Sequence, residues 1–304
     1  MIRWSLVWIV TLICAAVTAC AGGGSNPGGY EIVVTTNILG DVVRNVVGDE
    51  AAVRVLMQPN ADPHSFGVSA QDAAAMNGAG LIIYNGLGLE ENVTRNVESA
   101  AAQGVPVVAV GDHVDPIEYT EGDSAGVPDP HFWTDPQRMI AAVDIIEDAL
   151  THSVKGIDAD AVSRNTEDYR SQLRDLDAAM LAGFATIGTE RRKLVTNHHV
   201  LGYLAQRFGF TVIGAIVPSG TTLAAPSPSD LQSLTDAIAA ANVPAIFVDS
   251  SQPEKLARVL ADDTGIQVRI VPLHSESLGP PGTSAATYLD MMRANTESIV
   301  TGLR

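Results

Sequence analysis

The stretch DAVSRNTEDYRSQLRDLDAAMLAGFAT, residues 160–186, decides how the rest of the chain must be arranged. It contains no Pro, and its one Gly lies near its end, at position 183. Apolar side chains recur along it at spacings of 7, 4, 3, 4 and 4, which places them on one face of a continuous helix: Val162, Tyr169, Leu173, Leu176, Met180 and Phe184. Such a helix is about 40 Å long, more than the width of a small lobe.

Short β-rich runs alternate with helical patterns on both sides of this segment. The runs before it span 31–37, 51–57, 81–86 and 105–110, and those after it span 193–197, 211–217, 244–250 and 267–273. This alternation predicts parallel sheets covered by helices. We therefore predict an α/β fold of two lobes with mainly parallel sheets, joined by one long rigid backbone helix. The predicted parts are an N-terminal α/β lobe at 30–157, a linking helix at 158–188 and a C-terminal α/β lobe at 189–304.

The first 19 residues differ from the rest of the chain. An early Arg3, an apolar run and small residues before Cys20 predict a secretion signal. The sequence VTAC at 17–20 resembles the lipobox of bacterial lipoproteins. This resemblance implies cleavage before Cys20, a lipid on that cysteine and a place on the extracytoplasmic face of the cell membrane. An ordinary signal peptide or a short membrane anchor is the alternative. The glycine-rich segment 20–29 predicts a flexible tether.

Composition limits the partners of the protein. Its formal net charge of −17 argues against binding to nucleic acid, because phosphates would repel such a surface. Removal of the signal would also remove Cys14 and leave no thiol free to form a disulfide, so the fold must be held by packing alone. We expect a monomer.

Three histidines stand out by position. Two of them follow a stiff Asp-Pro pair, as Asp62-Pro63-His64 and Asp129-Pro130-His131. The third, His198, follows the run at 193–197, and we expect it to begin the next helix. In doubly wound sheets, ligands bind at the carboxyl ends of the strands. Three imidazoles gathered there predict a metal site.

Four separated stretches carry a resemblance to a known family: NADPHSFGVSAQDAAAMNGAGLIIYNGLGLE, DPHFWTDP, VTNHHVLGYLAQRFGF and SESLGPPGTSAATYLDMMRAN. In this order they resemble the zinc-type metal-binding lipoproteins, of solute-binding cluster A-I, that serve zinc and manganese ABC transporters. The resemblance covers nearly the whole mature chain. It implies two α/β lobes joined by one long helix, with the metal between the lobes.

The same resemblance implies the metal ligands His64, His131, His198 and Glu276. The family commonly has aspartate at the fourth position, and Glu276 is one methylene longer. His274 therefore stays open as a nearby alternative, and Asp249 as a distant one.

The expected function follows from this ligand set. Three neutral imidazoles favour Zn²⁺, whereas Mn²⁺ prefers more oxygen ligands. The resemblance implies an extracytoplasmic protein, not an enzyme, that captures Zn²⁺ and delivers it to an ABC transporter permease. The alternatives are delivery of manganese, a zinc-dependent hydrolase with Glu276 as base, and a surface adhesin. The acidic segment 111–130 is expected to be a solvated loop.

Overall fold

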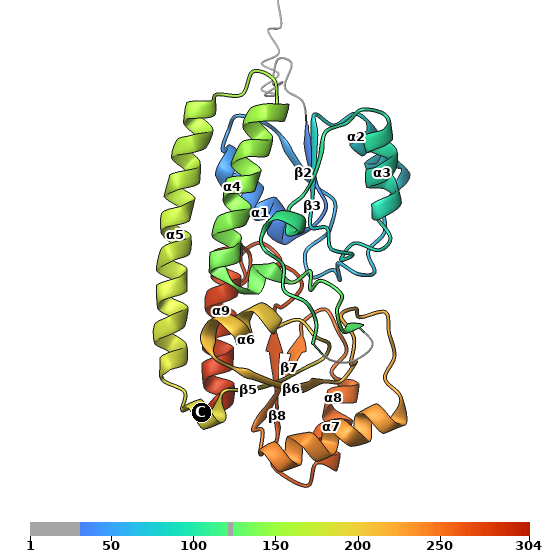
Figure 1. The fold of residues 1–304 in the computed structure, drawn as a ribbon, viewed down its shortest axis with the longest axis vertical. Coiled ribbons are helices and arrows are strands. Elements are labelled where there is room, and N and C mark those ends of the chain that lie inside the picture. The colour runs from blue at the N-terminus through green and yellow to red at the C-terminus, as the bar shows by residue number, and fades with distance from the viewer. Residues whose placement is uncertain (1–30, 121–123) are drawn as a thin grey trace, which may run out of the picture.

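The computed structural model describes residues 31–120 and 124–304. The predicted signal at 1–19, Cys20 and the tether at 20–29 lie outside the described residues. Figure 1 shows two α/β lobes stacked end to end, with one long helix running along both. In the described part of the chain, no helix combines the length and hydropathy needed to cross a bilayer.

The N-terminal lobe contains a four-stranded parallel sheet in the order β2-β1-β3-β4. Its strands are β1 (Ile32–Val34), β2 (Val53–Val55), β3 (Leu81–Tyr84) and β4 (Val107–Ala109). Its helices include α1 (Asn37–Val47), α2 (Ala70–Asn77), α3 (Thr94–Ala102) and the short 3₁₀ helix η1 (Gly111–His113). The central strand β1 has the sequence IVV and is buried on both faces, as expected for a parallel sheet covered by helices.

The C-terminal lobe repeats this arrangement, with the order β6-β5-β7-β8 and only parallel pairs. Its strands are β5 (Lys193–Thr196), β6 (Thr211–Ala215), β7 (Ala245–Asp249) and β8 (Arg269–Leu273). Its helices include α6 (Gly202–Phe208), α7 (Pro228–Ala241), α8 (Lys255–Asp263) and α9 (Tyr288–Leu303). Pro272 lies in the edge strand β8, where the missing N–H is tolerated. All eight predicted strands are confirmed, each one to four residues shorter than its predicted run.

The long helix α5 (Ala159–Ala185) contains 27 residues and confirms the helix expected from the apolar pattern. All six residues of the predicted stripe are buried on one face. Near its start, the side-chain amide of Asn165 donates to the carbonyl of Val46 in the N-terminal lobe. Near its end, the Phe184 ring packs against Phe208 and Phe210 of the C-terminal lobe, with centroids 5.0 Å apart in both pairs. A single helix therefore contributes to the cores of both lobes.

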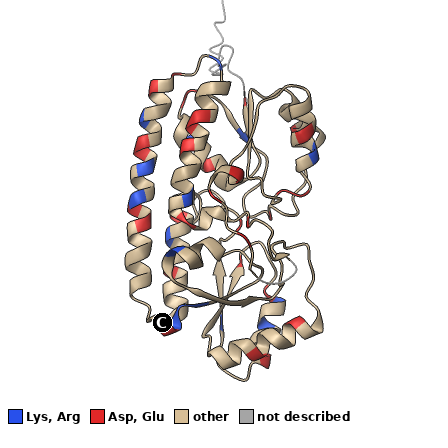
Figure 2. Ribbon diagram, viewed as in Figure 1, with Lys and Arg blue, Asp and Glu red and all other residues tan. Residues whose placement is uncertain are grey.

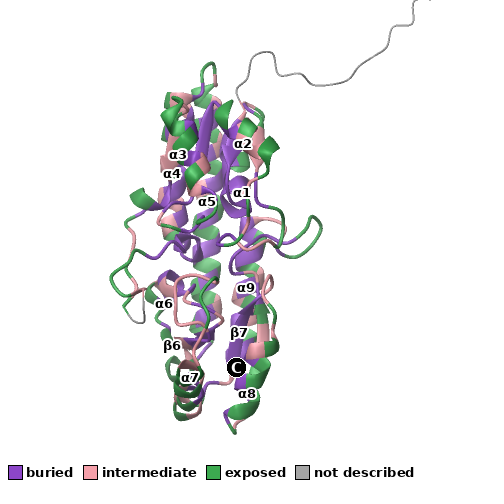
Figure 3. Ribbon diagram, turned by 90° about the vertical axis from the view of Figure 1, so that its right-hand side faces the viewer, coloured by how far each residue is buried: buried purple, intermediate pink, exposed green. Residues whose placement is uncertain are grey.

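Neighbouring helices hold α5 in place. Helix α4 (Pro136–Ser153) lies beside it, and both helices show charges of the two signs along their outer faces (Figure 2). Arg170 of α5 contacts Glu147 of α4 at 3.1 Å and also pairs with Asp144. Figure 3 shows that the buried residues of these helices lie on their inner sides, whereas many residues of α2, α3 and α8 are exposed. The hydrophobic core continues from β1 through α5 to β7, which makes the connection between the lobes stiff.

The carboxyl ends of both sheets face the boundary between the lobes. Asn37, just after β1, donates to the hydroxyl of Ser277 on the loop after β8, at 2.7 Å. The backbone N–H of Asn60, on the loop after β2, donates to the carbonyl of Leu278 at 2.8 Å. Loops that are far apart in sequence therefore meet at this boundary. This is where the candidate site lies.

Candidate metal centre

Four side chains converge between the lobes: His64, His131, His198 and Glu276. Each offers a ligand atom within 4.8 Å of the others, and each side chain is at most 1% exposed. Within residues 31–120 and 124–304, no other group of at least three His, Cys, Asp or Glu side chains comes this close together. The structure thus brings together the four residues named from the sequence.

Each of these residues lies on a loop rather than inside a regular element. His64 lies between β2 and α2, and His131 immediately precedes the 3₁₀ helix η3 (Phe132–Thr134). His198 follows β5, and Glu276 follows β8. All four loops leave the carboxyl side of their sheets, which is the usual place for a ligand site in a doubly wound fold.

The expectation that His198 begins a helix is wrong, because α6 begins only at Gly202. The hydroxyl of Thr196 donates to the His198 carbonyl, the group that would accept a helical hydrogen bond from residue 202. The next backbone N–H, that of His199, donates to the carbonyl of Ser219. These two contacts hold residues 197–201 as a loop, and in this loop the His198 ring lies beside the other ligands.

The distances between the four side chains fit a small divalent cation. Glu276 Oε2 lies 3.4 Å from His64 Nε2, and Glu276 Oε1 lies 3.5 Å from Nε2 of both His131 and His198. Nε2 of His131 and Nε2 of His64 are 3.4 Å apart. Four ligands placed tetrahedrally at about 2.0–2.1 Å from Zn²⁺ would be roughly 3.3–3.4 Å from one another.

Several of these buried polar atoms have no hydrogen-bond partner: His64 Nδ1, His198 Nε2 and both carboxylate oxygens of Glu276. Buried polar atoms are normally satisfied, and leaving them unpaired costs free energy. Three of these four atoms point at one shared centre, where a bound cation would satisfy them. The donor set therefore suits a metal ion.

The two Asp-Pro-His motifs share one feature and differ in another. In each, an aspartate oxygen accepts the backbone N–H of the histidine two residues later, at 2.9 Å for both Asp62 and Asp129. Only Asp129 also reaches the ring, where its Oδ1 lies 2.7 Å from His131 Nδ1. A carboxylate at this position keeps the proton on Nδ1 and leaves the lone pair of Nε2 free for the shared centre. Asp129 therefore orients the ring of His131, whereas Asp62 contacts the backbone N–H of His64 and not its ring.

Asp249 does not join the four ligands and instead supports them. Its Oδ2 accepts the backbone N–H groups of Ser275 and Glu276, both at 3.0 Å, and its Oδ1 accepts the N–H of Ser251 at 2.8 Å. The N–H of Asp249 donates to the side-chain oxygen of Asn197, whose amide nitrogen lies 3.0 Å from His198 Nδ1. One buried aspartate at the end of β7 thus holds both ligand loops of the C-terminal lobe.

His274 also lies outside the group of four. Its Nδ1 is 3.0 Å from the hydroxyl of Ser250, and its backbone N–H donates to Asn295. Asp249 and His274, the two alternatives for the fourth metal ligand, therefore both form other contacts.

Tyr119 is a site residue that the sequence did not reveal. Its hydroxyl lies 3.1 Å from His131 Nδ1 and 3.4 Å from the carbonyl oxygen of His199, to which it donates. Burial raises the pKa of Tyr119, so this phenol stays neutral. It belongs to the acidic segment 111–130, which was expected to be only a solvated loop. No spacing or motif around Tyr119 signals this contact, which depends on how the loop folds back over the site.

The electrostatics of the site are set by a buried carboxylate among imidazoles. Burial by itself lowers the pKa of His131, but the carboxylates of Glu276 and Asp129 outweigh it and raise that pKa above its ordinary value. Burial would raise the pKa of Glu276, yet His131 and His198 hold it well below its usual range. Glu276 is therefore ionised, as a metal ligand must be.

Two α/β lobes on one continuous helix, with a buried three-histidine, one-carboxylate site between them, define a metal-binding solute-binding protein. Comparison with known proteins agrees. The chain belongs to the family of the zinc-uptake complex component A, periplasmic (ZnuA), whose profile matches residues 32–302. This is a family of binding components of ABC transporters and not of enzymes.

Individual relatives carry different metals in their names. The zinc-binding protein TroA of Treponema pallidum is 32% identical over 280 residues, covering 90% of this chain and 89% of TroA. The solved TroA structure matches with a TM-score of 0.84 and 31% identity, covering 91% of this chain and 99% of that one. The manganese-binding lipoprotein MntA of Halalkalibacterium halodurans is 28% identical, covering 98% of this chain and 97% of MntA. The iron-binding protein YfeA of Yersinia pestis is 26% identical, covering 99% and 96%.

Proposed function

We propose that the protein captures Zn²⁺ between its lobes, through His64, His131, His198 and Glu276, and delivers it to an ABC transporter permease. The observation that carries the proposal is the convergence of three Nε2 atoms on one buried carboxylate at 3.4–3.5 Å. That spacing matches the edge of a zinc tetrahedron, roughly 3.3–3.4 Å.

The choice of zinc over manganese rests on the donor atoms. Three of the four ligands are imidazole rings, which bind a metal ion through a neutral nitrogen, and oxygen comes only from Glu276. Nitrogen-rich sites bind Zn²⁺ more tightly than Mn²⁺, which prefers oxygen. Manganese is the second candidate, because both oxygens of Glu276 face histidines and a carboxylate in that position can supply two oxygen ligands.

The cellular setting is part of the same proposal. We propose that Cys20 carries a lipid and that the segment 20–29 tethers the body to the extracytoplasmic face of the cell membrane. We also propose a monomer with its lobes at 30–157 and 189–304, linked by the helix segment 158–188. Relatives named as lipoproteins and as substrate-binding components of manganese ABC transporters support the anchor and the permease partner.

The stiff connection between the lobes restricts how the metal can leave. The continuous core along α5 opposes a wide hinge motion, since separating the lobes would break packed contacts at both ends of this helix. We therefore propose that release uses local movement of the ligand loops.

A titration of metal-free protein tests the proposal. The soluble fragment beginning at Ala21 is stripped of metal and titrated separately with Zn²⁺ and Mn²⁺. We expect tighter binding of Zn²⁺, and a loss of orders of magnitude in zinc affinity for His131→Ala. The exposed His152 of α4 supplies the matched control, and His152→Ala should bind zinc as the wild type does. Tighter binding of Mn²⁺ than Zn²⁺ would replace zinc by manganese as the cargo.

A further inference from the structure

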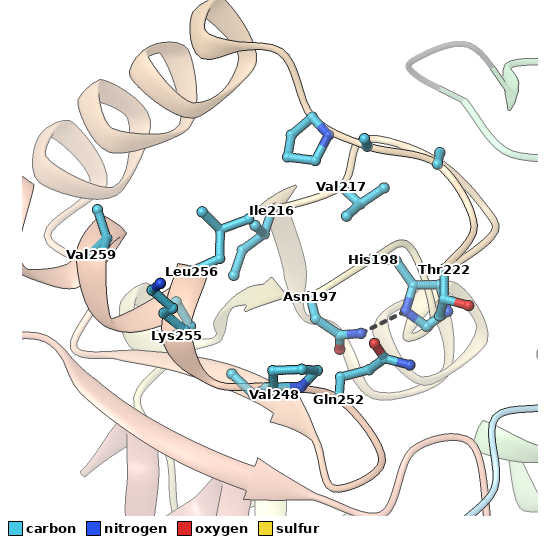
Figure 4. A pocket seen from close by; sticks show the side chains of 15 residues that line it. Asn197, His198, Ile216, Val217, Thr222, Val248, Gln252, Lys255, Leu256 and Val259 are labelled. Carbon is cyan, nitrogen blue, oxygen red and sulfur yellow. Dashed lines mark hydrogen bonds between the residues drawn. The ribbon is translucent and has the colours of Figure 1, made fainter.

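A second cavity lies in the C-terminal lobe, behind the metal site. It has a volume of about 400 Å³ and is lined mainly by aliphatic side chains of residues 216–226, which follow β6, and of α8. Figure 4 shows His198 and Thr222 at one end of this pocket and Val259 and Lys255 at the other. Concave, mostly apolar pockets of this size are typical binding sites.

One wall of the pocket belongs to the metal site itself. Asn197 and His198 line it, so the pocket shares a predicted metal ligand with the metal site. Anything that enters the pocket would therefore press on the loop that carries His198.

Another wall is the segment 217–226, here called the strap, which reaches across to the N-terminal lobe. The hydroxyl of Thr222 donates to Asp62 at 2.6 Å, and that of Thr221 donates to Glu91 at 2.9 Å. Asp62 also accepts the backbone N–H of His64. Thr222 thus lines the pocket and, through Asp62, is also linked to the loop that carries His64.

The outer rim of the pocket is apolar and exposed. The described residues include five exposed large hydrophobic side chains, and two of them, Val259 at 50% and Leu223 at 52% exposure, lie at or next to this pocket. An exposed apolar side chain therefore lies near each end of an apolar pocket, as on a surface that a partner could cover. The ammonium group of Lys255, an exposed residue of the lining, offers a positive charge on a chain with a net charge of −17.

We infer that this pocket is the docking site for the ABC permease, which inserts a large apolar side chain there and places an acidic group beside Lys255. Insertion moves the strap, breaks the Thr222–Asp62 hydrogen bond and opens the metal site from the side of His64 and His198. The inference rests on the proposed function, since it names the surface through which the same site is emptied. An apolar anchor in a pocket with a charged rim is the usual composition of a protein interface.

Two matched substitutions test the docking surface. Val259→Asp places a negative charge at the pocket rim on α8. Leu181→Asp places the same charge at a 43% exposed position on α5, away from the pocket. Binding is measured with the full-length protein and its cognate permease in nanodiscs. We expect Val259→Asp to weaken docking about tenfold or more, with zinc affinity unchanged, and Leu181→Asp to change neither. Equal permease binding by the two variants would overturn the inference.

Other occupants give different results. Binding of the wild type to phosphatidylglycerol vesicles without permease, lost in Val259→Asp, would identify a lipid surface instead. A concentration-dependent dimer in sedimentation, abolished by Val259→Asp, would identify a second copy of this chain. A wild type that binds no zinc would refute the proposed function and not the docking surface, because docking is measured independently.

The strap is tested without the permease. Thr222→Val removes the hydroxyl that holds Asp62, and the exposed Thr301→Val in α9 serves as the control. We expect zinc to pass to a chelator about fivefold faster from Thr222→Val, which corresponds to the loss of one hydrogen bond. Identical release rates from both variants would exclude the strap as the element that opens the site.

Discussion

The carboxylate oxygen Oδ1 of Asp129 lies 2.7 Å from Nδ1 of His131 and fixes which ring nitrogen faces the other ligands. The matching aspartate of the other motif, Asp62, contacts Ser65, Thr222 and Gln252 with its second oxygen. The two identical Asp-Pro-His motifs therefore have different structural roles. One orients a ligand ring, and the other links a ligand loop to the strap.

This difference predicts unequal effects of the same substitution in the two motifs. Asp129→Asn removes the charged acceptor of the His131 ring proton, and we expect zinc affinity to fall by about 10- to 100-fold. Asp62→Asn still offers an oxygen to the backbone of His64, so its affinity should fall by less. Competition titration with a zinc chelator measures both. Equal losses in the two variants would show that the ring contact of Asp129 has no special part in binding.

The fourth ligand can be tested by separating charge from length. Glu276→Gln keeps the size of the side chain but removes the charge that faces three imidazoles, and we expect a loss of about 100-fold or more in zinc affinity, since a ligating carboxylate must be ionised. Glu276→Asp keeps the charge and shortens the reach, so its loss should be smaller.

The control for this test is His274→Ala, which removes the nearby alternative ligand and should leave zinc affinity unchanged. Isothermal titration at one pH compares the three variants. If Glu276→Gln bound zinc normally and His274→Ala did not, the fourth ligand would be His274.

The pH dependence follows from the shifted pKa values of the metal-free site. The pKa of His131 is raised above 6.5 in the folded protein, so its stabilising contribution is complete below about pH 6.5 and is lost as pH rises through the raised value. The pKa of Glu276 is lowered from 4.5, so its contribution is present above about pH 4.5 and is lost as pH falls through the lowered value. Together these two groups stabilise the metal-free protein most between about pH 4.5 and 6.5.

Zinc binding has the opposite dependence, because a metal ligand must be a neutral imidazole. Protons compete at His131 up to a higher pH than at an ordinary histidine, so zinc affinity should still be rising above pH 6.5. We expect zinc to raise the Tm more at pH 8 than at pH 6, as measured by calorimetry at both values with and without zinc. An equal increase at both pH values would contradict the raised pKa of His131.

The inner face of α5 predicts a stability effect that does not involve metal. Leu173 is fully buried in the core, and Leu173→Ala should lower the free energy of unfolding by about 2–5 kcal/mol. Leu181 lies on the exposed side of the same helix, and Leu181→Ala should change it by less than about 0.5 kcal/mol. Urea denaturation of both metal-free variants measures the difference. Similar losses would mean that the helix does not pack through its predicted face.

Local patterns predicted the architecture well, because secondary structure follows from the spacing of apolar residues. The stripe from Val162 to Phe184 predicted α5, and a local capping box of Ser227 and Asp230 likewise marks the start of α7. The wrong expectation, a helix beginning at His198, failed for a tertiary reason: the Thr196 hydroxyl and the Ser219 carbonyl hold residues 197–201 as a loop.

The sequence by itself determined the two α/β halves and the helix between them. Through four motifs that follow one another along the chain, it also determined the four residues that meet at the site. Only the tertiary structure decided that Asp249 supports the ligand loops, that Asp129 but not Asp62 reaches a ring, and that Tyr119 contacts His131. These roles depend on contacts such as that of Asn37 with Ser277, across 240 positions of the chain. No local spacing encodes such contacts, because they arise from how the loops of two sheets pack against one another.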